Sequence, residues 1–138
     1  MSSKLFVFTT LVLAILLAAC SAASAVEPEP AGDPERGREI FEDINRVLCE
    51  RCHTLDGSFD VGPSLLGISE RAGDRIPELS AVEYLQQSIL EPSAYLVEGF
   101  KDKMKTYQVV DADEVDFLMY GMLTQEELND LIAFLLTQ

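Results

Sequence analysis

The chain has 138 residues, a length typical of one domain, and carries 24 acidic residues against 10 basic ones, for a net charge of −14. A protein this negative is poorly suited to bind the phosphate backbone of nucleic acid, so we expect no nucleic-acid partner. It has three cysteines and one histidine, and these residues carry most of the chemical information in the sequence.

The N-terminal segment has the features of an export signal. Lys4 precedes an apolar run from Leu5 to Ala19, which is long enough for a signal peptide but short for a membrane span. Cys20 directly follows Leu-Ala-Ala, which resembles the lipobox of bacterial lipoproteins. We therefore expect residues 1–19 to be a signal peptide and Cys20 to carry lipid on the extracytoplasmic or periplasmic side of a bacterial membrane. The alternatives are an ordinary cleavage site with an incidental cysteine and an uncleaved anchor helix.

A polar segment separates this signal from the folded part of the chain. Residues 20–32 are rich in Ser, Ala, Pro and Glu and have no apolar periodicity, which predicts a flexible tether. Loss of residues 1–19 removes one lysine and no acidic residue, so the mature charge is about −15. We expect residues 33–138 to form the single folded domain.

The first helix of this domain is predicted at its start. Asp33 is a suitable N-cap and Pro34 a suitable first residue. Apolar residues then recur at helical spacing, and this pattern predicts a helix that extends toward residue 48. The residues of the pattern are Ile40, Phe41, Ile44, Val47 and Leu48. Six glycines and prolines between residues 54 and 78 indicate a loop.

Two later helices begin with capping boxes. Ser80 with Glu83 precedes an apolar pattern that must end near Glu91, because Pro92 follows. Thr124 with Glu127 precedes the helical pattern that closes the sequence. No convincing strand pattern is present, so the sequence favours an all-α domain.

The segment Cys49-Glu50-Arg51-Cys52-His53 has the spacing of a c-type haem attachment site. On a helical turn, residues three and four apart share a face, so both thiols and the imidazole would meet one porphyrin while Glu50 and Arg51 point outward. The alternatives are a redox dithiol, which lacks its usual strand and helix pattern here, and half of a zinc site. An export signal and a single histidine favour haem.

At these residues the chain resembles the class I cytochromes c, a family of one-haem proteins. Gly37 and Phe41 before the motif, and Phe134 in the last helix, occupy places that look like the family's packing residues. The resemblance implies an all-α cytochrome c-like fold, about four helices and loops wrapped around one covalent haem c. It also implies that the Pro63 carbonyl accepts a hydrogen bond from His53, which would orient the imidazole and raise its basicity as an iron ligand.

The sequence offers several candidates for the sixth iron ligand. The chain has one histidine, so a second protein ligand would be methionine, which suits haem iron and raises its potential. The resemblance favours Met104, although Lys105 stands where the family usually has proline and residues 111–116 form an acidic insertion. Met119, Met122 and an iron with an open position remain as alternatives.

These features together predict an electron carrier, not an enzyme, that passes single electrons between exported membrane-bound redox complexes. Partners of this kind include a quinol-oxidising complex, a terminal oxidase and a photosynthetic reaction centre. The alternatives are a fixed haem subunit of a larger respiratory or photosynthetic complex, and a haem enzyme or gas sensor with open iron. The mature chain has three lysines, which flank Met104 and would either suit an acidic docking face or form a solvated loop. These are Lys101, Lys103 and Lys105. The resemblance, and not any local spacing, makes Tyr84 and Tyr95 candidates for hydrogen bonds to haem propionates.

Overall fold

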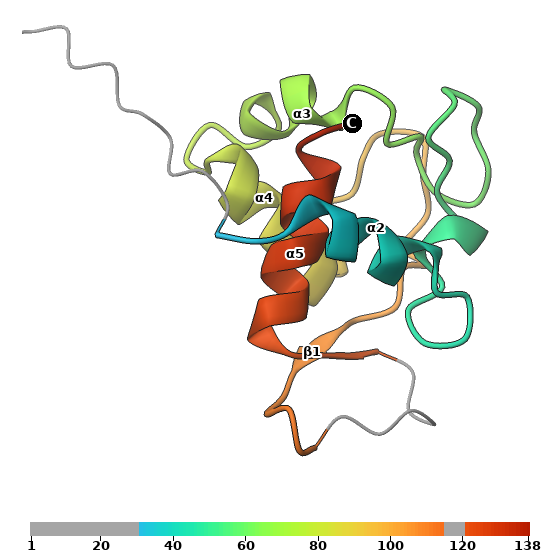
Figure 1. Ribbon diagram of the computed structural model, residues 1–138. Helices are drawn as coiled ribbons and strands as arrows, with labels where there is room; N and C mark the ends of the chain where they lie inside the picture. Colours follow the sequence, from blue (N-terminus) through green and yellow to red (C-terminus); the bar gives the residue numbers. More distant parts are fainter. Residues whose placement is uncertain (1–30, 115–120) are drawn as a thin grey trace, which may run out of the picture.

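The computed structural model describes residues 31–114 and 121–138, and the regular secondary structure of this part of the chain is mostly helical (Figure 1). Its four α-helices are α2 (Pro34–Glu42), α3 (Ile68–Arg71), α4 (Ala81–Leu90) and α5 (Gln125–Leu135). Three single-turn 3-10 helices are also present: η1 (Cys49–Arg51), η2 (Ala72–Asp74) and η3 (Pro92–Ala94). Two short strands pair in parallel, β1 (Gln108–Val109) and β2 (Met122–Leu123).

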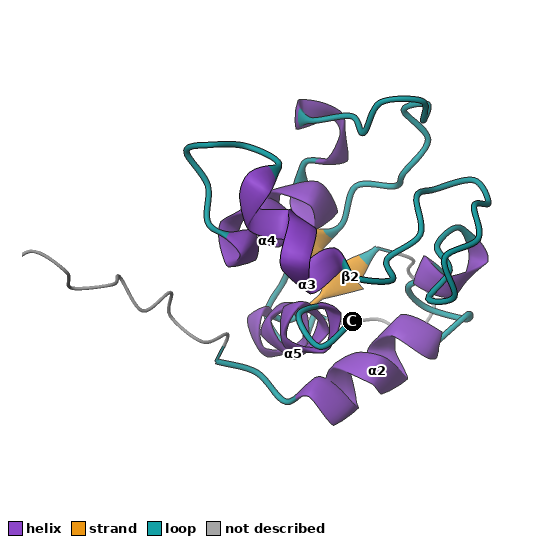
Figure 2. Cartoon of the chain, turned by 90° about the horizontal axis from the view of Figure 1, so that it is seen from above, coloured by secondary structure: helices purple, strands orange, loops and turns teal. Residues whose placement is uncertain are grey.

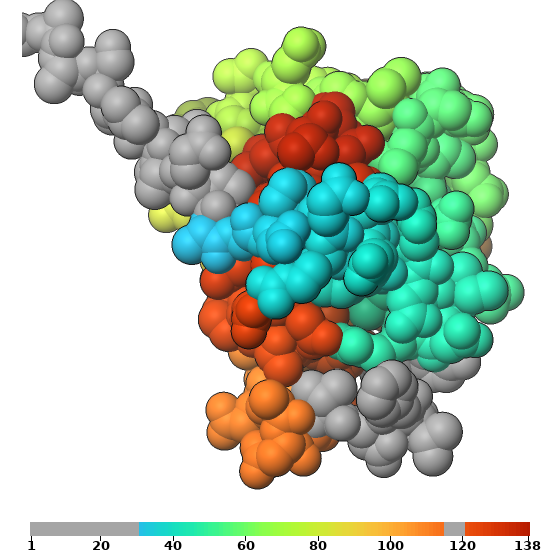
Figure 3. Space-filling view, viewed as in Figure 1, coloured from blue at the N-terminus to red at the C-terminus, as the bar shows by residue number. Residues whose placement is uncertain are grey.

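Helix α5 is the centre of the fold. Figure 2 shows it nearly end-on, with α2 on one side and α3 and α4 on the other, and Figure 3 shows α2 lying across its surface. Gly37 makes the crossing of α2 and α5 possible, because a Cβ atom there would overlap the main-chain carbonyl of Asp130. Beside this contact, the rings of Phe41 and Phe134 pack with their centroids 5.5 Å apart. The two ends of the domain are thereby joined.

The predicted helix starts are confirmed. The Asp33 carboxylate accepts a hydrogen bond from the Glu35 N–H at 2.9 Å, with Pro34 at the first position of α2. Helices α4 and α5 begin with complete capping boxes at Ser80 and Thr124, where the side chain and main chain of the cap residue both form hydrogen bonds to the glutamate three positions later. Helix α4 ends at Leu90, directly before Glu91 and close to Pro92, as expected.

The predicted extent of the first helix is wrong. Helix α2 ends at Glu42, and the side chain of Ile44 is 54% exposed instead of packed. The reason is local hydrogen bonding at Asp43, since its carboxylate accepts from the Asn45 N–H and its carbonyl accepts from the N–H groups of Arg46, Val47 and Leu48. Aspartate competes with the helix in this way at many helix ends.

Two further expectations need correction. The loop predicted between residues 54 and 78 contains α3, a single helical turn that starts after Gly67, whose φ is +68°. The strands β1 and β2 were not expected, because two residues each are too few to show an alternating pattern. In the described part of the chain, no helix has the length and apolarity needed to cross a membrane.

Candidate functional site

The attachment motif begins on the turn η1. Leu48 enters this turn with φ of +59°, and the N–H groups of Cys52 and His53 both donate to the Cys49 carbonyl, at 3.1 and 3.0 Å. The turn leaves the side chains of Glu50 and Arg51 exposed, whereas Cys49 and Cys52 are half-buried. The chain therefore folds so that the two thiols share one side of the turn, as a bivalent attachment requires.

The imidazole of His53 is held in place through its Nδ1 atom. Its Nδ1 lies 2.9 Å from the Pro63 carbonyl, which accepts its hydrogen bond when Nδ1 carries the proton and leaves Nε2 free as a ligand. Gly62 packs against the ring so closely that a Cβ atom there would lie 2.8 Å from Nδ1. Burial lowers the pKa of His53 below 6.5, although its hydrogen bond to Pro63 acts in the other direction. The ring is consequently neutral at neutral pH, the form that binds metals.

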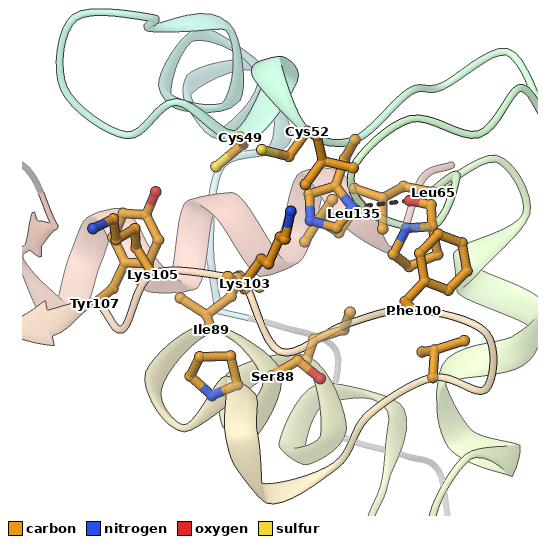
Figure 4. A pocket seen from close by; sticks show the side chains of 18 of the residues that line it. Cys49, Cys52, Leu65, Ser88, Ile89, Phe100, Lys103, Lys105, Tyr107 and Leu135 are labelled. Atoms are coloured by element: carbon orange, nitrogen blue, oxygen red, sulfur yellow. Dashed lines mark hydrogen bonds between the residues drawn. The ribbon is translucent and has the colours of Figure 1, made fainter.

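A cavity of about 560 Å³ connects these groups (Figure 4). Cys49 and Cys52 lie on one side of it, and Ser88 and Ile89 lie on the opposite side. Its lining is mostly apolar and comes from α4, α5, the segment that follows α4, and residues between 41 and 75 that include the turn η1. A mostly apolar cavity of this size with few convergent polar groups is typical of cofactor sites.

Met104 reaches the same cavity from a different part of the chain. It lies on the segment from Glu91 to Tyr107, here called the methionine arm, and its side chain is 38% exposed at the cavity. Met122 is half-buried on β2 and is not among the residues that line the cavity. Met119 and the predicted lipid site at Cys20 lie outside the described residues. Among the described methionines, Met104 is thus the one positioned at the cavity.

The state of the thiols bears on the alternative of a redox dithiol. Burial raises the pKa of the Cys49 thiol from 9.0 to about 11, with a smaller opposing effect from the nearby Tyr107 hydroxyl. Reactive cysteines of redox dithiols have lowered pKa values, because the thiolate is the nucleophile. Cys49 is therefore a poor redox nucleophile before any cofactor is attached.

The other predicted residues also gather at the cavity. Tyr84 and Tyr95 line it as an edge-to-face pair with ring centroids 5.8 Å apart. All three lysines of the predicted docking patch line its mouth and are exposed. Figure 4 shows two of them, Lys103 and Lys105, on the methionine arm.

Sequence reasoning missed two arginines of the cavity wall. The Nε atoms of Arg46 and Arg75 are buried and form no hydrogen bond within the described residues. Arg46 is paired with Glu127 at 2.5 Å, whereas Arg75 forms no ion pair within the described chain. Haem carries two propionate carboxylates, so free buried donors beside an apolar cavity, two thiols and a neutral imidazole fit this group. No sequence spacing marks these arginines, since their positions depend on the packing of distant segments.

Comparison with known proteins agrees with this geometry. The cytochrome c family model matches residues 34–138, which covers the described cavity and both helices of the α2–α5 crossing. The match confirms the predicted all-α fold class and supports a covalently bound haem c with a role in electron transfer. Proteins of this family are generally electron carriers and not enzymes. Because the match extends over most of the sequence and includes the Cys-x-x-Cys-His turn, the chain belongs to the cytochrome c family.

Proposed function

We propose that this cytochrome c carries one haem whose iron is held by His53 and Met104, and that it passes single electrons between exported membrane-bound redox complexes. One observation supports this most strongly: the turn with Cys49 and Cys52, the oriented imidazole and the thioether of Met104 all line one cavity. These residues come from two segments about fifty positions apart in the sequence. A histidine and methionine pair leaves no open iron position for substrate or gas.

Each residue has a distinct part in this function. Cys49 and Cys52 hold the porphyrin covalently, and the Pro63 carbonyl keeps the His53 ring from rotating. Bound haem supplies one iron that accepts and releases a single electron. Two protein ligands and a mostly apolar cavity keep the surroundings of the iron similar in both oxidation states, which favours rapid transfer. Apolar walls also limit the access of water and small ligands.

Spectroscopy of the holoprotein tests the ligand assignment. The oxidised protein should show the near-infrared band of methionine sulfur bound to ferric haem iron, and Met104→Ala should abolish it and lower the potential. Met122→Ala is the matched control, because Met122 lies away from the cavity, and it should leave the band in place. A band that persists in Met104→Ala would contradict the assignment. Ready binding of carbon monoxide by the reduced wild type would favour an open iron instead.

The lysine patch supports a partner with an acidic docking face. Lys101, Lys103 and Lys105 are exposed at the cavity mouth of a protein whose total charge is −14. Replacing all three by alanine should reduce the salt dependence of the electron-transfer rate, because attraction between exposed charges is screened by salt. Arg38→Ala is the control, since Arg38 is a cation on α2 outside the cavity lining. An unchanged salt dependence in the triple variant would remove this docking surface.

The membrane anchor and the alternative of a fixed subunit are tested together. If Cys20 carries lipid, the wild type should require detergent for extraction and Cys20→Ser should be released in soluble form. A mobile carrier should leave the membrane without other proteins. Co-purification with a larger redox complex in constant proportion would instead identify a fixed subunit.

A further inference from the structure

Tyr107 closes the methionine arm at the point where the chain returns to the core. It is 8% exposed and directly follows six consecutive exposed residues, 101–106, which include Met104. Its N–H donates to the Ile89 carbonyl of α4 at 3.3 Å, and the next residue, Gln108, begins the pairing with β2. The arm is therefore fixed at Tyr107, three positions after the proposed ligand.

The phenol hydroxyl of Tyr107 reaches across the fold to the attachment turn. It donates to the main-chain carbonyl of Val47, sixty positions earlier and two positions before Cys49. Val47 is itself 1% exposed, and its N–H donates to the Asp43 carbonyl. In Figure 4 the Tyr107 ring lies at the Cys49 end of the pocket, away from Leu65 and Phe100. This contact links the segment of one proposed iron ligand to the segment that leads into the other.

Covalent attachment of haem at Cys49 makes the Tyr107 hydroxyl more important as a donor to the Val47 carbonyl. The Sγ atom of Cys49 lies 3.9 Å from the same Val47 carbonyl, so the free thiol is a second, weak donor to it. When the sulfur bonds to a vinyl carbon of the porphyrin, the hydrogen of the thiol moves to the other vinyl carbon and the sulfur can no longer donate. A buried carbonyl without a donor is costly, and Tyr107 is then its remaining hydrogen-bond donor within the described chain.

We propose that Tyr107 is a positioning residue, whose hydroxyl anchors the methionine arm to the attachment turn and so determines how firmly Met104 binds the iron. This inference rests on the proposed ligation by Met104. Loss of the hydroxyl leaves the ring in the core but releases the arm from the Val47 carbonyl. An added ligand such as imidazole must displace Met104 to reach the iron, so its apparent affinity reports how firmly the arm is held.

The test compares imidazole binding to three ferric holoproteins. Tyr107→Phe should bind imidazole about five to thirty times more tightly than wild type, the range expected for loss of one buried hydrogen bond. Gln108→Ala is the control, because Gln108 is the exposed neighbour of Tyr107 and its side chain forms no hydrogen bond within the described residues. It should bind imidazole as wild type does.

Met104→Ala separates failure of this inference from failure of the ligand assignment. If Met104→Ala keeps the near-infrared methionine band, Met104 is not the ligand and both proposals fall. If it loses the band while Tyr107→Phe and wild type bind imidazole equally, the ligand assignment stands and the role of Tyr107 is overturned. Equal tightening in Gln108→Ala would also overturn it, because the effect would then come from any change in this segment.

Discussion

The α2–α5 pair and the methionine arm are held in place by different forces. At the helix crossing, two main chains meet at Gly37, two phenylalanine rings pack beside it, and the residue Asp130 is only 2% exposed. In the arm, residues 101–106 are all exposed, and Tyr107 provides the buried anchor at its end. We infer that packing within the protein holds the helix pair, whereas the exposed part of the arm, residues 101–106, depends on the group that fills the cavity.

The largest effect is expected at the helix crossing. Gly37→Ala places a methyl group against the Asp130 carbonyl, so α2 and α5 must separate and the packing of Phe41 on Phe134 is lost. We expect the free energy of unfolding of the holoprotein to fall by about 3 to 4 kcal/mol, since main-chain atoms cannot move aside as a flexible side chain can. Urea denaturation followed by far-ultraviolet circular dichroism measures this change.

Gly73→Ala is the matched control for this substitution. A Cβ atom at Gly73 would make its nearest contact at 3.7 Å, an ordinary van der Waals distance, and the backbone there is not left-handed. The change should alter the free energy of unfolding by less than about 0.5 kcal/mol. If the two alanine variants were equally stable, the close approach of α2 and α5 would not be the main constraint on this pair.

Removal of a buried carboxylate should cause the second-largest loss of stability at the helix crossing. Asp130 accepts a hydrogen bond from the Asp33 N–H at 2.6 Å, and its other oxygen lies 3.2 Å from Arg36. Asp130→Ala should lower the free energy of unfolding by about 2 to 3 kcal/mol, because the Asp33 N–H loses its acceptor. Glu126→Ala removes an exposed partner of Arg36 and should cost less than about 1 kcal/mol. If denaturant titrations showed similar losses in the free energy of unfolding for Asp130→Ala and Glu126→Ala, the buried carboxylate would not stabilise the crossing more than the exposed one.

The difference between local contacts and contacts with distant segments explains which parts of the fold could be predicted from sequence. The starts of α2, α4 and α5 were predictable, because each depends on a side chain that bonds to the main chain within three positions. The end of α2 was not, because the apolar residues that continue the helical pattern have different surroundings. Val47 is 1% exposed but lies outside the helix, and Ile44 is 54% exposed. An apolar pattern at helical spacing therefore fixes neither which of its residues are buried nor which element buries them.

The residues of the candidate site also fall into two groups, those placed by local spacing and those placed by distant segments. The positions of Cys49, Cys52 and His53 on one turn follow from local spacing. The contact of Tyr107 with Val47 and the placement of Arg75 at the cavity connect segments far apart in the chain, and no short motif encodes them. Residues that act through local geometry can be identified from sequence, whereas residues that close the cavity require the fold.

An ion pair at the edge of the helix pair adds a pH-dependent contribution. Burial alone would raise the pKa of Glu127, but Arg46 at 2.5 Å and the Thr124 N–H outweigh burial and hold it below its ordinary value of 4.5. A lowered pKa means that this stabilisation is present above pH 4.5 and is lost as the pH falls through the lowered value. Glu127→Gln should therefore cost about 1.5 kcal/mol at pH 7 and much less near pH 3. An equal loss at both values would show that the charge of Glu127 is not responsible.

Controls aside, the smallest loss of stability is expected in the methionine arm, from the same glycine-to-alanine change that is most costly at the helix crossing. Gly99 has φ of +89°, but a Cβ atom there would meet nothing within 4 Å. Gly99→Ala should thus cost only the backbone strain of a left-handed alanine, about 1 kcal/mol in the free energy of unfolding of the holoprotein. That is about a third of the loss expected for Gly37→Ala, although both changes add one methyl group. If Gly99→Ala proved as destabilising as Gly37→Ala in the same denaturant titration, the arm would be packed as tightly as the helix pair, and the dependence of the arm on the bound group would have to be abandoned.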